Sequence, residues 1–540
     1  MLVTRSKSVR HVCILGLFVL GAFLIYSNIL TSYFLSDDFA QIGKVLSGDR
    51  SVVWGQMHGG FFRPLFILSY MIDSSIWRAR PFGYHLTNVV FHALSSFLTY
   101  LFALRLLEHI AISPRTKEKV SLAASLLFLL HPSHTEVVSW ISGRADAIAT
   151  FLCLASLLWF LTYAKNMRTV HLAGSLACFG LAVLAKESAI CLPFLVLVLS
   201  ASRFYVHTSN KSFRQTVKAT APFFFILLAF ILVRALFLGT LVGGYGTSQH
   251  LNFSFGWLRD RFLEASLRSV LPALPSSWAS FLYKPLKSPL FILLAVLSLV
   301  LIASAIVVRR NWYTRPERNE QNRLLLELSA LFLFSLLPVI SLRLSLYNTQ
   351  GERFLYLPSV FSSLILSYLL VMLIRKTKLF LAILICLLCF YSIALYRTNR
   401  IWREAAQLSL NIKDDLFRSS IRSQALVLNA PDNLRGVPVY HNGLPEVIKY
   451  FAKQNQIQQV AILSFQNLET LHDRVQLDRG PEYLTLNTLN DHDSFDRVSG
   501  SNCVDVINHS RNSVRFQVKD CGSRADLFFF DNGDMVLLNR

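Results

Sequence analysis

Long apolar stretches, separated by short polar segments, fill the first three quarters of the chain. Most hold about 20 residues, which is the length that a helix needs to cross a bilayer. We therefore predict about eleven membrane spans. Their expected bounds are 11–34, 83–108, 119–132, 145–164, 169–185, 188–205, 218–240, 288–308, 323–344, 353–374 and 378–396. No such stretch occurs after residue 397, so the remainder is expected to be a separate polar tail.

The composition supports this interpretation. Of 540 residues, 53% are hydrophobic and only 16% are charged, which is too little charge to cover a soluble protein of this length. The net charge of +21 could indicate a nucleic-acid partner. The basic residues, however, lie mostly in short loops between apolar stretches, where they set the orientation of spans. We therefore expect the chain to lie in a lipid bilayer and to bind no nucleic acid.

The first stretch could be a signal peptide, but it is long and lacks a clear cleavage site, so we expect a retained span.

Residues 61–77 could form either a further span or an amphipathic helix lying in the interface. If they lie flat, every segment on the N-terminal side of the membrane is basic, for example around Arg115, Lys165 and Arg309. Positively charged loops mark the cytoplasmic side, so the flat helix is favoured. An eleven-span chain then has a cytoplasmic N-terminus and an extracytoplasmic C-terminus.

Two domains follow from this topology. A membrane domain covers 1–400, with outer segments 35–82 and 240–287, and a small extracytoplasmic α/β or α+β domain covers 401–540. The tail contains helical stretches and strand-like runs. The helical stretches are 400–422 and 444–454, and the strand-like runs are 424–429, 459–465, 482–489, 513–518 and 525–530. Cys503 and Cys521 lie in the tail and could form a disulfide in an oxidising compartment, although spacing alone leaves this open.

Polar clusters fall at the span ends on the outer face. Charges near a bilayer are costly and tend to mark function, so their convergence on one face predicts a site there. The clusters are Asp37-Asp38, His131 to Glu136, Arg144 with Asp146, Lys186-Glu187 and Glu352-Arg353.

Each cluster has a functional and a plainer interpretation. An aspartate of the first pair could act as a general base, or the pair could simply end a helix in water. His131, His134 and Glu136 could bind a sugar or a divalent metal, but their spacing matches no strong zinc pattern and no cofactor is certain. Arg144 with Asp146, and Lys186 with Glu187, could simply form local ion pairs. Arg353 could hold a phosphate or anchor its span at the interface.

The order of these segments resembles the protein O-mannosyltransferase-like branch of the GT-C glycosyltransferases, and most closely the TMTC type. The resemblance covers about residues 10–405. The strings that carry it are SDDFAQI at 36–42, FFRPLFILSYMID at 61–73, PFGYHLTNVVFHAL at 81–94, HPSHTEVVSWISGRADAIATFL at 131–152, AKESAI at 185–190 and GERFLYLPSV at 351–360.

The resemblance implies a GT-C fold and an inverting glycosyltransferase. The implied donor is a polyprenyl- or dolichyl-phosphate-linked monosaccharide, and the implied acceptor is a hydroxyl of a protein or glycan at the extracytoplasmic face. Asp37 or Asp38, with Asp38 preferred, would be the catalytic base, and Arg353 would suit the donor phosphate. The remaining residues would line or brace the site, namely Arg63, His134, Glu136, Arg144, Asp146, Lys186, Glu187 and Glu352.

The tail departs from the TMTC type, which continues into TPR repeats, because no 34-residue repeat is found here. The segment 426–451 instead resembles tails of bacterial relatives, so a bacterial inner membrane is the expected location. Two other classes stay open. A transporter or lipid flippase would need internal repeats and polar residues near the bilayer midplane. An inactive relative could serve as a binding or assembly protein.

Overall fold

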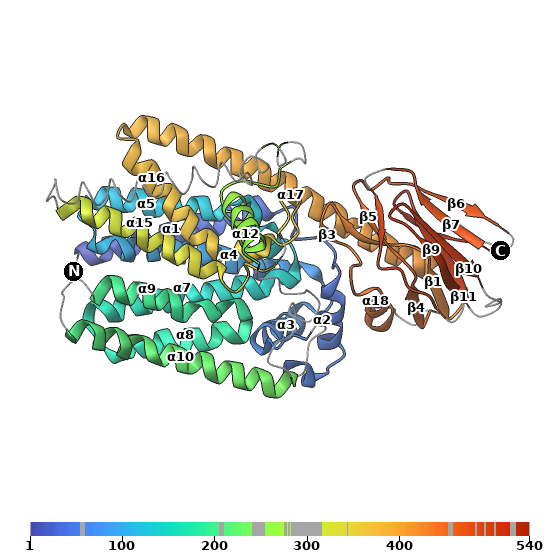
Figure 1. Ribbon diagram of the computed structural model, residues 1–540, viewed down its shortest axis with the longest axis horizontal. Helices are drawn as coiled ribbons and strands as arrows, with labels where there is room; N and C mark the ends of the chain where they lie inside the picture. The colour runs from blue at the N-terminus through green and yellow to red at the C-terminus, as the bar shows by residue number, and fades with distance from the viewer. Residues whose placement is uncertain are drawn as a thin grey trace.

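The computed structural model describes residues 2–54, 60–204, 210–239, 254–274, 278, 281, 316–342, 344–451, 457–480, 483–490, 493–501, 504–518 and 525–538. These residues form a bundle of long helices joined to a strand-rich C-terminal domain (Figure 1). The predicted span 288–308 and both tail cysteines, Cys503 and Cys521, lie outside the described residues.

The bundle follows the apolar pattern of the sequence. Its helices are α1 (Leu2–Tyr26), α4 (Pro81–Leu106), α5 (Pro114–Leu129), α7 (Arg144–Asn166), α8 (Thr169–Ala185), α9 (Leu192–Phe204), α10 (Asn210–Leu238), α15 (Pro316–Leu336), α16 (Pro358–Leu373) and α17 (Thr377–Ser419). Among the described residues, six helical segments are long and apolar enough to cross a membrane, and α8 and α16 are shorter apolar helices. The chain is therefore a multi-pass membrane protein.

Short elements close the end of the bundle that faces the strand domain (Figure 1). They include α2 (Asp37–Leu46) and α3 (Pro64–Trp77), and the helices α6 (Thr135–Val138) and α12 (Phe255–Arg268) both contact the turn Glu352–Leu355. Helix α3 has 14 residues, and at about 1.5 Å per residue it is too short to cross a bilayer core of about 30 Å. This agrees with the expectation that 61–77 is not a span.

Helix α17 differs from the expectation. It runs for 43 residues without a break, so the last span and the first helix expected in the tail are one element. The composition changes from apolar to polar near residue 397, but the helix continues through this change. The strand domain thus begins at the end of a continuous helix.

Within its described residues, the strand domain contains three four-stranded sheets and one helix, α18 (Leu444–Phe451). The first sheet has the order β12-β11-β1-β4, in which β1 is parallel to both β11 and β4. The other two have the orders β6-β7-β10-β9 and β3-β2-β5-β8.

All five predicted strand runs are found in these sheets, as β1 (Gln424–Val427), β4 (Gln459–Ile462), β7 (Tyr483–Thr488), β10 (Ser513–Val518) and β11 (Ala525–Asp531). The sequence did not reveal the others. These are β2 (Ala430–Leu434), β3 (Val437–Pro438), β5 (Phe465–Leu468), β6 (Val475–Arg479), β8 (Ser494–Asp496), β9 (Val504–His509) and β12 (Asp534–Leu537).

Candidate active site

The two adjacent aspartates begin α2, and their side chains point to different partners. Asp38 is buried, with 1% of its surface exposed. Its Oδ1 accepts hydrogen bonds from the backbone N and the hydroxyl of Ser142, at 2.9 and 2.5 Å. Its Oδ2 accepts one from the backbone N of Leu35 at 3.0 Å. Asp38 therefore ties the start of α2 to the turn at Ile141–Gly143 that precedes α7.

Burial raises the pKa of Asp38 to about 7, and the hydrogen bonds from Ser142 and Leu35 oppose part of that rise. The neighbouring charge of Asp37 raises it further. A carboxyl group with a pKa near neutrality exchanges a proton readily at physiological pH, which suits general-base chemistry.

Asp37 is half-buried and faces the strand domain. Its Oδ1 accepts a hydrogen bond from Nδ2 of Asn442 at 2.8 Å. The two carboxylates thus diverge, and only Asp38 is directed into the bundle end.

Among the described residues, five ion pairs involve members of the polar clusters, and every one joins segments that are distant in sequence. They are Arg63 with Glu187, Arg144 with Asp73, Lys186 with Asp146, Arg268 with Glu352, and Arg353 with Glu136. The local pairs that the sequence left open, Arg144 with Asp146 and Lys186 with Glu187, are therefore not formed. Side chains one or two positions apart on a helix do not face each other, and Lys186 is extended between α8 and the 3₁₀ turn Glu187–Cys191, so its neighbour points elsewhere.

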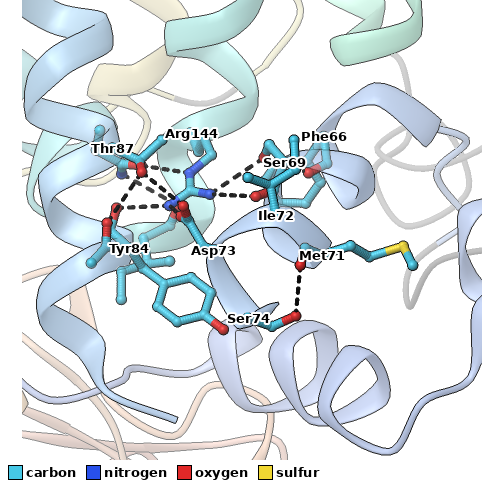
Figure 2. Close-up of polar contacts among 12 residues, drawn as sticks. Phe66, Ser69, Met71, Ile72, Asp73, Ser74, Tyr84, Thr87 and Arg144 are labelled. Atoms are coloured by element: carbon cyan, nitrogen blue, oxygen red, sulfur yellow. Dashed lines mark hydrogen bonds and ion pairs between the residues drawn. The ribbon is translucent and has the colours of Figure 1, made fainter. Parts of the chain in front are cut away.

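Arg144 is completely buried and holds three helices together (Figure 2). Its guanidinium pairs with Asp73 of α3 at 2.6 Å and donates to the carbonyl of Tyr84 in α4 at 2.7 Å. Its Nε donates to Oδ1 of Asn88, also in α4, at 2.8 Å. Asp73 in turn accepts a hydrogen bond from Thr87 at 2.9 Å. Because α7 carries Arg144, this network fixes α3 against both α4 and α7.

Arg353 is held by both oxygens of Glu136. The Arg353 backbone N donates to Oε2 at 2.8 Å, and its Nη1 donates to Oε1 at 2.6 Å. The guanidinium carbon lies 5.3 Å from the ring centre of Trp140. Nε1 of Trp140 donates to the carbonyl of Leu35 at 3.4 Å. Trp140 thereby links Arg353 to the turn that carries Asp38.

Glu136 and Glu352 lie in one charged cluster with Arg353. Burial raises the pKa of Glu136, while Arg353 and Lys186 oppose the rise and Asp146 adds to it. Burial also raises the pKa of Glu352 to about 7, against the opposing effect of Arg268. Oε2 of Glu352 accepts a hydrogen bond from Thr135 at 3.3 Å, beside Glu136. Residues from five segments of the chain therefore meet at this end of the bundle.

The two histidines of the same segment are buried and engaged by the protein. Nε2 of His134 lies 2.8 Å from the hydroxyl of Ser359, and Nε2 of His131 lies 3.0 Å from the carbonyl of Ser269. Within the described part of the chain, no three His, Cys, Asp or Glu side chains gather in a metal-binding arrangement. His134 packs against the ring of Tyr356 at 4.6 Å and so braces the helix that follows Arg353.

Several residues of the site were not predicted. Asp73 and Asn88 lie within sequence strings that carried the family resemblance, but no role was predicted for either residue. Ser142 and Asn442 act through hydrogen bonds that sequence spacing does not reveal. Arg268 ends α12, in a segment where no motif indicated it.

Comparisons with known proteins give the following similarities. No protein-family model matches the chain. The protein O-mannosyl-transferase Tmtc1 of Drosophila melanogaster is 33% identical over 189 residues, which is 31% of this chain and 20% of that protein. The protein O-mannosyl-transferase TMTC2 of Homo sapiens is 34% identical over 162 residues, covering 28% of this chain and 18% of that protein. The match thus spans about a fifth of the length of these relatives.

Among solved structures, ArnT of Cupriavidus metallidurans bound to undecaprenyl phosphate aligns with 93% of this chain and 97% of its own, with a TM-score of 0.44 and 10% identity. The expected fold class is confirmed in the described residues, which form a polytopic helical membrane protein with a small strand-rich C-terminal domain. The resemblance that the motifs indicated is confirmed as well, since this chain is similar in sequence to the protein O-mannosyltransferases of the TMTC type.

Proposed function

We propose that this chain is an integral membrane glycosyltransferase that moves a monosaccharide from a polyprenyl-phosphate donor to an acceptor hydroxyl. The observation that carries the proposal is the gathering of the aspartate pair and five ion pairs at one end of the helical bundle. Charges in such number at the edge of a membrane domain indicate function rather than packing. The partial similarity to O-mannosyltransferases supports the reaction class.

Asp38 is the proposed base. A carboxylate has about four acceptor positions, and three hydrogen bonds of Asp38 are found among the described residues. In the proposed complex, the fourth position accepts a hydrogen bond from the acceptor hydroxyl. In the proposed step, Asp38 takes the hydroxyl proton while the hydroxyl oxygen bonds to the anomeric carbon. The bond between that carbon and the phosphate oxygen breaks, and the lipid phosphate leaves with the electron pair, which inverts the anomeric configuration.

Arg353 is the proposed partner of the lipid phosphate. Its side chain is 21% exposed, whereas the other four cations of the ion pairs are 8% exposed or less. A partly exposed guanidinium can add a phosphate ligand while it keeps its carboxylate partner, because its five N–H groups offer two donating edges. It would stabilise the charge that develops on the leaving phosphate. The other pairs, including those of Arg63, Lys186 and Glu187, would brace the site.

The test supplies membranes containing the chain with radiolabelled polyprenyl-phosphate sugars and follows transfer of the label. Wild type, Asp38→Asn, Asp37→Asn and Asp49→Asn are compared. Asp49 is a matched control, because it is an exposed aspartate of the same outer segment that caps a short 3₁₀ turn. The proposal expects transfer by wild type and Asp49→Asn and its loss in Asp38→Asn. No transfer by wild type from any tested sugar, or full transfer by Asp38→Asn, contradicts it.

A further inference from the structure

One segment of the strand domain, 439–443, lies directly on the turn that carries the two aspartates. The backbone N of Ser36 donates to the carbonyl of Val439 at 2.9 Å. The backbone N of Asn442 donates to the Ser36 hydroxyl at 3.2 Å, and its side-chain amide donates to Asp37. About four hundred residues separate the two segments, so these contacts exist only because the strand domain is docked on the bundle.

Ser36 has a backbone conformation that an L-residue adopts only under constraint. Its φ is 47° and its ψ is −114°, immediately before α2 begins. Such strain persists only where the surroundings fix the backbone, and it concentrates at functional sites. Both the backbone N and the hydroxyl of Ser36 are engaged by the strand domain. The strand domain therefore helps to hold the turn in this conformation.

Two glycines permit the close approach. A Cβ on Gly443, whose φ is +98°, would lie 2.3 Å from the carbonyl oxygen of Ser36. A Cβ on Gly43 of α2 would lie 2.4 Å from the ring of Tyr450 in α18. Neither position has room for a side chain, so the bundle and the strand domain are in direct van der Waals contact around the aspartates.

An aromatic core continues across the same contact. Phe39 of α2 stacks on Tyr440, with ring centres 5.7 Å apart and an angle of 15°. Phe451 of α18 packs against both Phe34 and Phe39. The hydroxyl of Tyr440 donates to the carbonyl of Ser409 in α17 at 2.7 Å. The strand domain is thus packed on the site as well as tethered to it by α17.

We infer that the strand domain is part of the catalytic unit, and that Asn442 is a positioning residue that holds Asp37 and, through the turn, Asp38. The catalytic meaning of this inference rests on the proposed transferase function, whereas the docking does not. A hydrogen bond from a neutral amide fixes the direction of the Asp37 carboxylate and keeps it turned away from Asp38. Residues distant from the reacting atoms can thereby set the geometry of a base.

Four variants of the full-length chain test the inference. Asn442→Leu removes the amide at similar volume, and Asn442→Gln keeps an amide on a longer side chain. Gly443→Ala obstructs the approach to Ser36. Gly533→Ala is the matched control, because Gly533 also has a positive φ of +92° but its Cβ would meet only the carbonyl of Leu471, within the strand domain.

Two measurements are made on each purified variant. Amide hydrogen exchange of 36–46 reports the docking without any assay of activity, since the Ser36 amide is protected by Val439. Transfer kinetics report kcat and KM for the lipid-linked sugar. We expect Asn442→Leu and Gly443→Ala to accelerate exchange and to lower kcat about tenfold to a hundredfold, with KM changed by less than about twofold. Asn442→Gln should recover most of kcat, and Gly533→Ala should match wild type.

Wild-type exchange and kcat in both Asn442→Leu and Gly443→Ala would overturn the inference. Faster exchange with unchanged kcat would overturn the positioning role. If wild type transfers no sugar, the proposed function fails instead, and the exchange data alone then decide whether the strand domain fixes the aspartate turn.

Discussion

At the scale of single residues, the site is built from charges that are neutralised by distant partners. Lys186 pairs with Asp146, forty positions away, and Arg353 pairs with Glu136 across more than two hundred. Removing either partner of a buried pair leaves an uncompensated charge, which is strongly destabilising. These residues therefore have to be tested with substitutions that separate folding from chemistry.

The pKa of Asp38 gives a prediction about pH. A general base must be ionised to accept a proton, so the transfer rate should rise as the pH increases through about 7, the value to which burial raises this pKa. Asp38→Asn should lower the rate by about a hundredfold to ten-thousandfold and remove this dependence. Transfer rates between pH 5.5 and 8.5 check both statements. A steep rise near pH 7 that survives in Asp38→Asn would assign the titration to another group.

Arg353 gives a second prediction. Arg353→Lys retains the charge but loses the planar arrangement of donors, whereas Arg353→Met loses both. We expect the KM for the lipid-linked donor to rise in the order wild type, Arg353→Lys, Arg353→Met, with about tenfold or more for Met. Titration of the donor at saturating acceptor measures this. An unchanged donor KM in Arg353→Met would show that this arginine does not bind the donor phosphate.

The sequence singled out most residues of the candidate site but not their partners. Asp38, Glu136 and Arg353 were found because they are polar residues at the ends of apolar stretches. Their partners were mostly missed or misassigned, because a hydrogen bond such as that from Ser142 to Asp38 depends on how two turns approach in space. The local pair of Arg144 with Asp146 is not formed for the same reason, since proximity in sequence did not imply contact.

At the scale of elements, the apolar pattern predicted where the helices of the bundle lie, because length and hydropathy are the main marks of a membrane helix. Eleven spans were expected, whereas six helical segments among the described residues are long and apolar enough to cross a membrane. The pattern did not reveal that α17 continues from the bundle to the strand domain, since composition changes along it while the backbone does not. Short strands such as β3 and β8 were missed because two or three residues carry no detectable alternation.

The contact of α3 with α4 and α7 gives a prediction about stability. Arg144→Met leaves Asp73 buried without its cation, so the free energy of unfolding should fall by about 3–5 kcal/mol. The double variant Arg144→Met/Asp73→Leu removes both charges and should recover part of the loss. Thermal unfolding of the purified protein in detergent measures each variant. If Arg144→Met unfolds at the wild-type temperature but is inactive, Arg144 acts on the substrate and not on the helices.

At the scale of the whole molecule, the two termini lie at opposite ends of the long axis, with the strand domain beyond one end of the bundle (Figure 1). The aspartate turn, the ion pairs and the strand domain share that end. The basic residues around Arg115 and Lys376 flank helix ends that face away from it. By the positive-inside rule, we propose that the site lies on the extracytoplasmic face.

The most direct test of this arrangement asks from which side of the membrane single introduced cysteines react with a charged, membrane-impermeant maleimide. The labelling of each variant is compared with that of the unsubstituted chain. Ser47→Cys, Tyr347→Cys and Asp534→Cys are placed at exposed positions near the aspartates, near Arg353 and in the strand domain. Arg115→Cys and Lys376→Cys mark the other end. In sealed right-side-out vesicles, the first three should react at once and the last two only after permeabilisation. Reaction of Ser47→Cys and Tyr347→Cys from opposite sides would contradict a shared site.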